Sequence, residues 1–327
     1  MSFVQQRRTH LMALTALLLG RQAPAMASTD YPARPVTIVL GNVVGGAVDM
    51  MARITANGLA KQLGQPVNVE NRVGATGTIG AAHVVRSPAD GYTLFFAGSG
   101  FTIAPAMMSL SYDPIRDFEP LGMVATVPNI LVVHPSVQAG SVSELIALAK
   151  QKPNELSYVS AGPASINRMA GELFQDRAGV QLLQVPYKGT GEAMADMLSG
   201  RVHMAFDQLS SVLPHIRAGK LKPLAVTGTE RVSYLPEIPT ISESGLPGYS
   251  IISWFGLLAP PKTPKEVLAK LERGLQAVLE TPDAQAAIRR IGAEPVTNGT
   301  AQALGDFMRA DLAKWSAIVK TKGIKIQ

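Results

Sequence analysis

The sequence predicts an α/β fold with two domains, and three observations support this prediction. Apolar, strand-like segments alternate with helical patterns along the 327 residues, which is typical of parallel sheets with right-handed helical crossovers. The chain is also long enough to bury two cores. Glycines or small hydroxyl residues follow several predicted strands, so we expect exposed backbone amides at one rim of the sheet.

The first predicted unit is a strand, a glycine turn and a helix. The strand covers Val36 to Leu40, the turn contains Gly45 and Gly46, and the helix continues to Leu63. Free N–H groups and the positive end of the helix dipole meet at such a turn, so the place suits an anion. The alternative is that the paired glycines only let the helix pack tightly on the strand.

The next segments repeat this alternation. A strand over 65–70 is followed by a loop whose glycines open a helix to about residue 86, and a third strand over 92–97 ends in a turn at Ala97–Gly100. Two short strands around Pro128 then predict the first crossing between domains. A second set of strands is expected at 157–160, 182–186, 202–207 and 224–227, with helices at 142–151, 166–178, 192–199 and 209–218.

The last part of the chain returns to the first domain. Residues 228–250 are rich in Pro, Ser, Glu and Gly and predict a loop, and the apolar segment 251–258 predicts the return strand. Three helices near 264–280, 283–291 and 300–320 close the chain. We therefore expect one domain over 28–128 plus 252–327 and a second domain over 129–251.

The N-terminus has the pattern of a signal peptide. Arg7-Arg8 is a basic region, Leu11 to Leu19 is apolar, and Ala25-Met-Ala27 fits a small-x-small cleavage site. We expect cleavage after Ala27 and a soluble protein exported to the periplasm. The paired arginines raise the twin-arginine route, but the residues after them favour the general secretory path.

Composition excludes several classes of protein. The chain has no cysteine, so disulfides and thiolate metal sites are excluded. Without the predicted signal peptide it carries 27 Lys and Arg against 24 Asp and Glu, a net charge of +3. This balance predicts no nucleic-acid partner, because nucleic-acid binding needs a clustered basic face.

Together the motifs resemble the solute-binding proteins of tripartite tricarboxylate transporters, the Bug-type family. The resemblance covers the mature chain in order. It is carried by Pro35-Val-Thr-Ile-Val, Gly45-Gly46-x-x-Asp49-x-x-Ala-Arg53, Val69-Glu-Asn-Arg72-x-Gly-Ala75, Asp90-Gly-Tyr-Thr-Leu94, Tyr112-Asp-Pro, Val185-Pro-Tyr-Lys-Gly189, Leu224-Ala-Val-Thr227, Leu235-Pro-x-x-Pro-Thr240 and Trp254-x-Gly-x-x-x-Pro260.

The resemblance implies a type II periplasmic binding protein fold, in which two α/β domains joined by two crossover strands hold the ligand in the cleft between them. It implies a monomer that captures a small organic anion, most readily a carboxylate, and delivers it to membrane transporter subunits. No cofactor and no metal are expected. In that family two strand–helix loops hold a carboxylate, and here those loops are Gly41–Asp49 and Ser160–Arg168.

Two departures from the family pattern affect the ligand. The first loop has Gly41-Asn42 where Pro-Phe is usual, so an aromatic wall is lost and an amide is gained. In the second loop Arg168 replaces a histidine, which adds a permanent cation. These changes leave the fold and the class of protein intact and leave the identity of the ligand open.

The candidate ligand-binding residues lie at the predicted strand ends of both domains. They are Asn42, Gly45, Gly46, Asp49, Thr76, Thr78, Ser99, Ser160, Gly162, Ser165, Asn167, Arg168, Tyr187 and Asp207. Arg168 suits a carboxylate because a guanidinium binds it with two hydrogen bonds, although an arginine in a first helical turn often points to solvent. Asp49 either stabilises its helix N-terminus or contacts the ligand. Trp254 is expected to pack near a hinge.

Two other functions stay open. A periplasmic protein that signals to a membrane sensor kinase would use the same closed state, and the sequence does not separate it from a transporter receptor. An enzyme is the second alternative. No histidine pair has the spacing of a helical zinc site, and no nucleophile elbow or phosphate-binding loop is present, so we expect no catalytic residues.

Overall fold

The computed structural model describes residues 31–162, 164–187, 190–232 and 235–324. The chain divides into two units, residues 1–33 and residues 34–327, and the second contains every element named below. The predicted signal peptide, residues 1–27, lies outside the described residues. We describe residues 34–327 by themselves.

A mixed six-stranded sheet contains the first predicted strands. Its order is β11 (Glu294–Pro295), β4 (Glu119–Val127), β10 (Ser253–Ala259), β3 (Thr93–Gly98), β1 (Val36–Leu40) and β2 (Val67–Asn71). Strand β1 pairs in parallel with β2 and β3, as the sequence predicts. The expectation of a parallel sheet does not extend to the other half of this sheet, because β10 runs antiparallel to both β3 and β4.

A five-stranded sheet contains the second set of strands. Its order is β7 (Leu183–Pro186), β6 (Ser157–Ser160), β8 (Met204–Gln208), β5 (Asn129–Val133) and β9 (Lys222–Val226). The chain passes from β4 to β5 at Pro128 and returns from β9 to β10 over residues 227–252. These are the two predicted crossings between two α/β domains. The residue limits of the domains stay a prediction.

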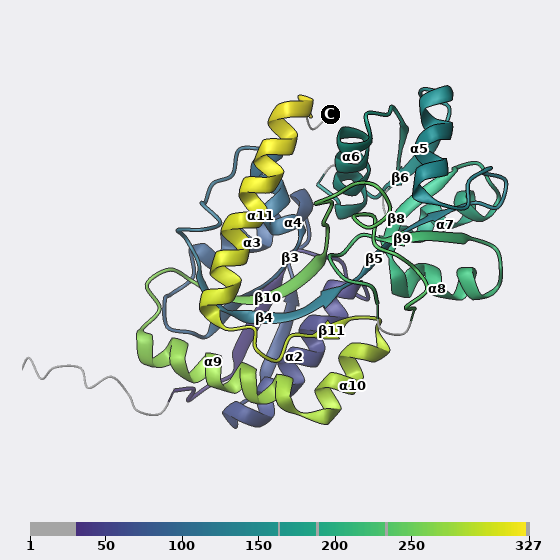
Figure 1. The fold of residues 1–327 in the computed structure, drawn as a ribbon. Coiled ribbons are helices and arrows are strands. Elements are labelled where there is room, and N and C mark those ends of the chain that lie inside the picture. Colours follow the sequence, from purple (N-terminus) through teal and green to yellow (C-terminus); the bar gives the residue numbers. More distant parts are fainter. Residues whose placement is uncertain (1–30, 163, 188–189, 233–234, 325–327) are drawn as a thin grey trace, which may run out of the picture. The chain divides into compact units, whose positions relative to one another are not determined.

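Helices flank both sheets (Figure 1). They are α2 (Ala47–Leu63), α3 (Thr78–Val85), α4 (Gly100–Met107), α5 (Val142–Gln151), α6 (Ile166–Ala178), α7 (Thr190–Leu198), α8 (Leu209–Arg217), α9 (Lys265–Glu280), α10 (Pro282–Arg290) and α11 (Ala301–Lys322), with a 3₁₀ turn, η1, at Ala75–Gly77. The sequence does not predict α4, because Gly100 and Pro105 lie within it and both disfavour a helix. It also misses the two-residue strand β11.

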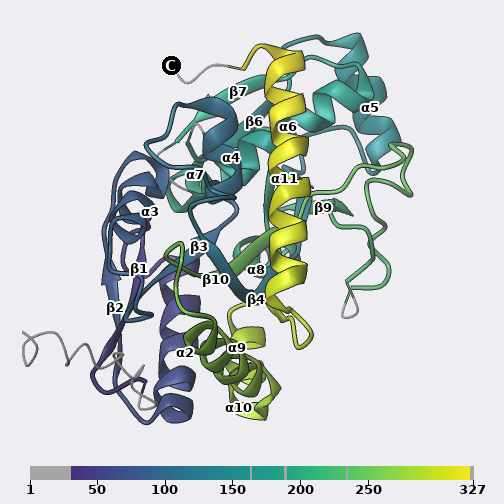
Figure 2. The same ribbon diagram turned by 90° about the vertical axis from the view of Figure 1, so that its left-hand side faces the viewer.

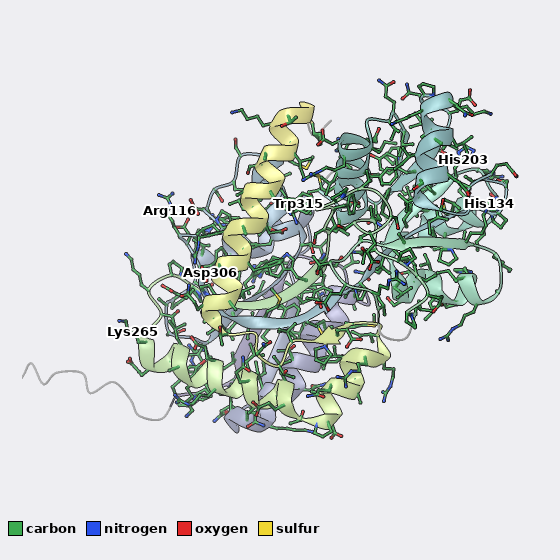
Figure 3. The ribbon with its side chains drawn as sticks, in the orientation of Figure 1. Arg116, His134, His203, Lys265, Asp306 and Trp315 are labelled. Carbon is green, nitrogen blue, oxygen red and sulfur yellow. The ribbon has the colours of Figure 1, made fainter. Side chains whose placement is uncertain are left out.

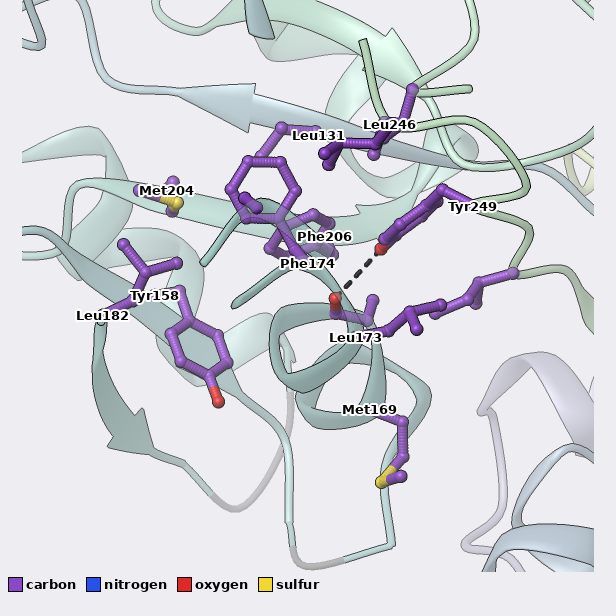
Figure 4. Packing of buried hydrophobic residues seen from close by; sticks show 14 of the residues in the cluster. Leu131, Tyr158, Met169, Leu173, Phe174, Leu182, Met204, Phe206, Leu246 and Tyr249 are labelled. Atoms are coloured by element: carbon purple, nitrogen blue, oxygen red, sulfur yellow. Dashed lines mark hydrogen bonds between the residues drawn. The ribbon is translucent and has the colours of Figure 1, made fainter. Parts of the chain in front are cut away.

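One apolar core joins helices from distant parts of the chain. Phe174 on α6 and Phe206 on β8 pack with Tyr249, whose hydroxyl donates to the carbonyl of Ala170 over 2.9 Å (Figure 4). The same core contains Ile103 of α4 and Trp315 of α11. Helix α11 runs beside α4 and α6 (Figure 2). Two helices whose residues belong to the first predicted domain therefore also pack on the core of the second sheet.

Candidate functional site

A cavity of about 470 Å³ lies where strand ends of the two sheets meet. Residues that follow β1 and β3 line one wall, and residues that follow β6 line the opposite wall together with Gln208 at the end of β8. In α/β sheets this edge, where parallel strands end and helices begin, is where ligands bind. The cavity therefore has the position that the glycine-rich strand ends predict.

The first wall is built largely from main chain. A Cβ atom on Gly41 would lie 2.2 Å from the Cα of Gly77, so the loops after β1 and before α3 approach each other backbone to backbone. Thr76, beside Gly77, has a φ of 59°, a left-handed conformation that costs energy for a β-branched residue. Thr76 nevertheless lines the cavity.

Strands β3 and β10 form the floor beneath this wall. The hydroxyl of Ser99 accepts a hydrogen bond from the Trp254 N–H over 3.1 Å, which fixes Ser99 where β3 ends. The rings of Phe96 and Phe255 stack with centroids 6.3 Å apart, and both line the cavity. Trp254 itself is fully buried and packs edge-on against Phe307, as the sequence predicts.

The second wall begins with a capped helix N-terminus. Ser165 is the N-cap of α6, and its hydroxyl accepts from the Arg168 N–H over 3.3 Å and donates to the Gly162 carbonyl over 2.8 Å. This arrangement satisfies one of the free amides of the first turn. The hydroxyl of Ser165 is thereby held at the cavity wall.

A buried amide and a buried carboxyl group support the second wall from behind. The Asn167 side chain donates to the Phe206 carbonyl over 2.7 Å and to an Asp207 oxygen over 3.3 Å. Burial raises the pKa of Asp207 to about 6, although the Gln208 N–H and the Asn167 amide both favour its charged form. Asn167 lines the cavity, whereas Asp207 stands behind it.

A second cavity, of about 510 Å³, adjoins the first. The two share Ile166, Asn167 and Gln208 as lining residues. Residues of α2 and α10 line the second cavity on one side, and Asp207 with the first turn of α8 lines it on the other. This cavity therefore also lies between elements that flank different sheets.

The structure brings part of the predicted site together. The predicted residues that line the first cavity are Asn42, Thr76, Thr78, Ser99, Gly162, Ser165 and Asn167. The predicted residues that do not line it are Gly45, Gly46, Asp49, Ser160, Arg168, Tyr187 and Asp207. The two loops named by the family resemblance therefore both line the cavity. The first contributes Gly41, Asn42, Val43 and Val48, and the second contributes Gly162, Ala164, Ser165, Ile166 and Asn167, preceded by Ala161.

Asp49 is engaged within the first loop. It is buried and forms hydrogen bonds with the Arg53 guanidinium, the Asn71 amide and the Gly45 N–H over 2.9–3.0 Å. The Arg53 side chain, together with Gly45 and Asn71, lowers its pKa to about 2 despite its burial. Of the two roles left open by the sequence, these contacts are those of a carboxylate that holds the turn before α2.

Three other predicted residues have contacts away from the cavity. The Arg168 Nε lies 4.0 Å from a carboxylate oxygen of Glu172, one turn along α6. The Tyr187 hydroxyl donates to Asp196 over 2.8 Å. Ser160 is fully buried and accepts a hydrogen bond from the Gln184 side chain over 3.0 Å.

Sequence reasoning missed Phe96, Phe255, Ser253 and Gln208, all of which line the cavity. Phe255 and Ser253 reach it only because β10 inserts between β3 and β4, more than 120 residues along the chain from β4. Gln208 directly follows Asp207 at the end of β8, so the rule that strand ends carry the site would have found it. No local sequence pattern indicated that Phe96 and Phe255 would meet at the cavity.

No histidine lines the cavity within the described residues. His134 and His203 lie together in the part of the chain that forms the five-stranded sheet (Figure 3). The backbone N–H of His134 donates to the backbone carbonyl of His203. Within the same described ranges, no group of three or more His, Asp or Glu side chains is placed to hold a metal ion. No helix in that part of the chain has the length and apolar character that crossing a membrane requires.

Comparison with known proteins agrees with this geometry. Residues 51–324 match the family described as tripartite tricarboxylate transporter family receptor. The chain is 35% identical to the protein BugT of Bordetella pertussis over 98% of this chain and 99% of BugT. Two similar solved structures come from Rhodopseudomonas palustris, Rpa4515 with adipate and MatC with bound malate. Rpa4515 is 38% identical with a TM-score of 0.79, and the match covers 90% of this chain and 99% of that one. MatC is 30% identical with a TM-score of 0.77, and the match covers 88% of this chain and 100% of that one.

Proposed function

We infer a solute-binding function from the family, because this chain belongs to the tripartite tricarboxylate transporter receptors. The fold is that of a type II periplasmic binding protein, with two α/β domains and two crossings. Its relatives with adipate and malate are carboxylate-binding proteins of the same fold. We propose that this protein likewise captures a small carboxylate and delivers it to membrane transporter subunits, and that it performs no catalysis.

The proposed binding site is the cavity of about 470 Å³ between the two sheets. The observation that carries this proposal is the donor chemistry of its walls. Thr76, Ser99 and Ser165 line the cavity, and strand ends rich in glycine place backbone amides beside them. The Ser165 hydroxyl would exchange its hydrogen bond to the Gly162 carbonyl for one to the carboxylate. Hydrogen bonds from such donors to a carboxylate are each worth roughly 1.5–3 kcal/mol.

The apolar part of the cavity favours a ligand with a hydrocarbon body. Phe96 and Phe255 form a stacked surface at the floor, and Val43, Val48 and Val73 add aliphatic lining. A carboxylate group on an aliphatic chain matches both kinds of surface. Dicarboxylates of four to six carbons are therefore the first compounds to test.

A ligand panel tests this function. Purified protein freed of ligand is heated with adipate, malate, citrate and benzoate, and with adipamide and 1,6-hexanediol as uncharged controls. A carboxylate at about 100 times its Kd stabilises the folded state by about 2.7 kcal/mol, a rise of several degrees in Tm. Stabilisation by the uncharged compounds alone would contradict the proposal.

A matched pair of variants tests the location of the site. Ser165 and Ser141 are both N-cap residues, of α6 and α5, and each accepts a hydrogen bond from the amide three residues later. Ser165→Ala and Ser141→Ala should each cost about 1 kcal/mol of stability. Only Ser165→Ala should weaken adipate in calorimetric titration, by about ten-fold, and equal affinities would exclude Ser165 from the site.

Export of the protein is part of the proposal. Members of this family are periplasmic binding proteins, and BugD is one whose structure is known. We propose that residues 1–27 are removed after Ala27 and that the mature protein is a monomer. Mass spectrometry of protein recovered from the periplasm should give the mass of a chain that begins at Ser28. Retention of residues 1–27 would contradict this prediction.

A further inference from the structure

A glycine and a serine touch at the edge of the second cavity. Gly292 follows α10, whose neighbour β11 pairs with β4 of the six-stranded sheet, and Ser210 lies in the first turn of α8, after β8 of the five-stranded sheet. A Cβ atom on Gly292 would lie 2.2 Å from the Cβ of Ser210 and 3.1 Å from its Cα. Elements that flank different sheets therefore approach this closely only because residue 292 has no side chain.

This contact differs from a larger connection between the sheets. Where α6, α4 and α11 meet, Phe174, Ile103 and Trp315 share one apolar core. Helix α10 lies near the bottom of Figure 1, whereas α6 and α11 approach each other near its top. The packed core is suited to hold the sheets together in every state, whereas a contact between a glycine and a serine is small enough to form and break.

The Gly292–Ser210 contact is separate from the ligand cavity. Neither residue lines the first cavity. Ser210 lines the second cavity, which shares Asn167 and Gln208 with the first. A change at residue 292 therefore alters how far the sheets approach each other without removing a donor from the proposed ligand site.

We propose that Gly292 and Ser210 form the contact on which the cleft closes, so that the size of residue 292 sets ligand affinity from outside the site. This inference rests on the proposed function. A ligand that bridges both walls binds the closed state more tightly than the open state, and this difference in affinity drives closure. A side chain at residue 292 stops the approach and removes the contribution of one wall.

Gly219 provides a matched control for Gly292. Each is the residue after the C-cap of a helix, their φ angles are +67° and +75°, and each N–H donates to the carbonyl three residues earlier over 2.9 Å. No atom lies within 4 Å of a Cβ on Gly219. Alanine thus brings the same backbone strain at both positions and a steric block at residue 292 alone.

The test is calorimetric titration with adipate of wild type, Gly292→Ala, Gly219→Ala and the double variant Ser210→Gly/Gly292→Ala. We expect Gly292→Ala to weaken adipate ten-fold or more, Gly219→Ala to bind within two-fold of wild type, and the double variant to recover part of the loss. Both alanine variants should unfold at similar urea concentrations without ligand, because an opened cleft relieves the clash at residue 292. X-ray scattering should show compaction by adipate in Gly219→Ala and less compaction in Gly292→Ala.

The possible outcomes distinguish a failure of the proposed function from a failure of the proposed closing contact. If wild type binds no carboxylate of the panel, the proposed function fails and the inference with it. If wild type binds adipate and Gly292→Ala binds it as tightly as Gly219→Ala, the inference alone is wrong. An equal loss of affinity in both alanine variants, or no recovery in the double variant, would assign the effect to backbone strain and also overturn it.

Discussion

The wall that follows β1 and β3 is made mostly of main chain, whereas the wall that follows β6 and β8 depends on buried polar side chains. Gly41 and Gly77 touch through their backbones in the first wall. In the second wall, Ser165 and Asn167 are fixed by hydrogen bonds to the Gly162 and Phe206 carbonyls. The first wall should therefore be sensitive to any added atom, and the second to the loss of a hydrogen bond.

The largest effect is expected from Gly41→Ala. Its new methyl group would lie 2.2 Å from the Gly77 Cα, and backbone cannot move aside as a side-chain tip can. We expect a loss of about 2–3 kcal/mol in the free energy of unfolding and at least a ten-fold loss of adipate affinity. Urea unfolding and calorimetry measure both.

Gly46→Ala is the control in the same loop. Its Cβ would meet the Val43 carbonyl at 3.5 Å, an ordinary contact, and its φ of −75° suits alanine. Because Gly46 is the N-cap of α2, where glycine is preferred to alanine, this variant should lose no more than about 1 kcal/mol. Equal behaviour of the two variants would contradict the close backbone packing of the first wall.

Asn167→Ala should show the next largest effect. The substitution leaves the Phe206 carbonyl and the Asp207 carboxyl group buried without the Asn167 donor, at a cost of about 1–3 kcal/mol. Adipate should also bind more weakly, because the side chain lines the cavity. Asn68→Ala, at an exposed position on β2, serves as the control. A loss in Asn167→Ala no larger than in this control would show that the second wall does not depend on its buried amide.

Asp207→Asn should change how stability depends on pH. Burial raises the pKa of Asp207 to about 6 from an unfolded value near 4, so the folded state binds the proton more tightly. The stability of wild type relative to the variant should therefore be greatest below about pH 4, fall as pH rises through 6, and level off above it. The total change is at most about 3 kcal/mol. Urea unfolding of both proteins from pH 4 to 8 measures this change. A stability of wild type relative to the variant that rises with pH would contradict the claim that burial raises the pKa of Asp207.

The smallest effect on binding is expected from Arg168→Ala. Although Arg168 follows the capped turn of the second wall, its side chain lies beside Glu172 and does not line the cavity. Adipate affinity should change less than two-fold in calorimetry. A ten-fold loss would instead place the guanidinium in the ligand site, as the sequence alone suggested.

Local sequence signals predicted most of the fold. Segments such as Val36–Leu40 and Val142–Gln151 carry the strand or helix pattern of the element that forms. Helix α4 was missed because Gly100 and Pro105 argue against a helix, and packing of Ile103 into the core overrides that preference. The antiparallel place of β10 was also missed, since strand direction depends on where the chain returns.

The sequence predicted the residues of the candidate site that lie at the ends of strands or in the turns after them. Thr76, Ser99 and Ser165 follow glycine turns or strands, and the structure brings them to one cavity. Asp49 and Arg168 have the right chemistry in the right loops, but nearby Arg53 and Glu172 engage them, and a sequence does not show which way a helical side chain turns. Phe96 and Phe255 meet only through the sheet order.

A crystal structure of this protein, from crystals grown with adipate, would test most directly the claim that the ligand binds between the two sheets, because it would locate the ligand. The account predicts adipate in the cavity between the sheets, with carboxylate oxygens within hydrogen-bonding distance of Thr76 or Ser99 on one wall and of Ser165 on the other. Adipate bound to one wall alone, or bound elsewhere on the chain with this cavity holding only water, would contradict it.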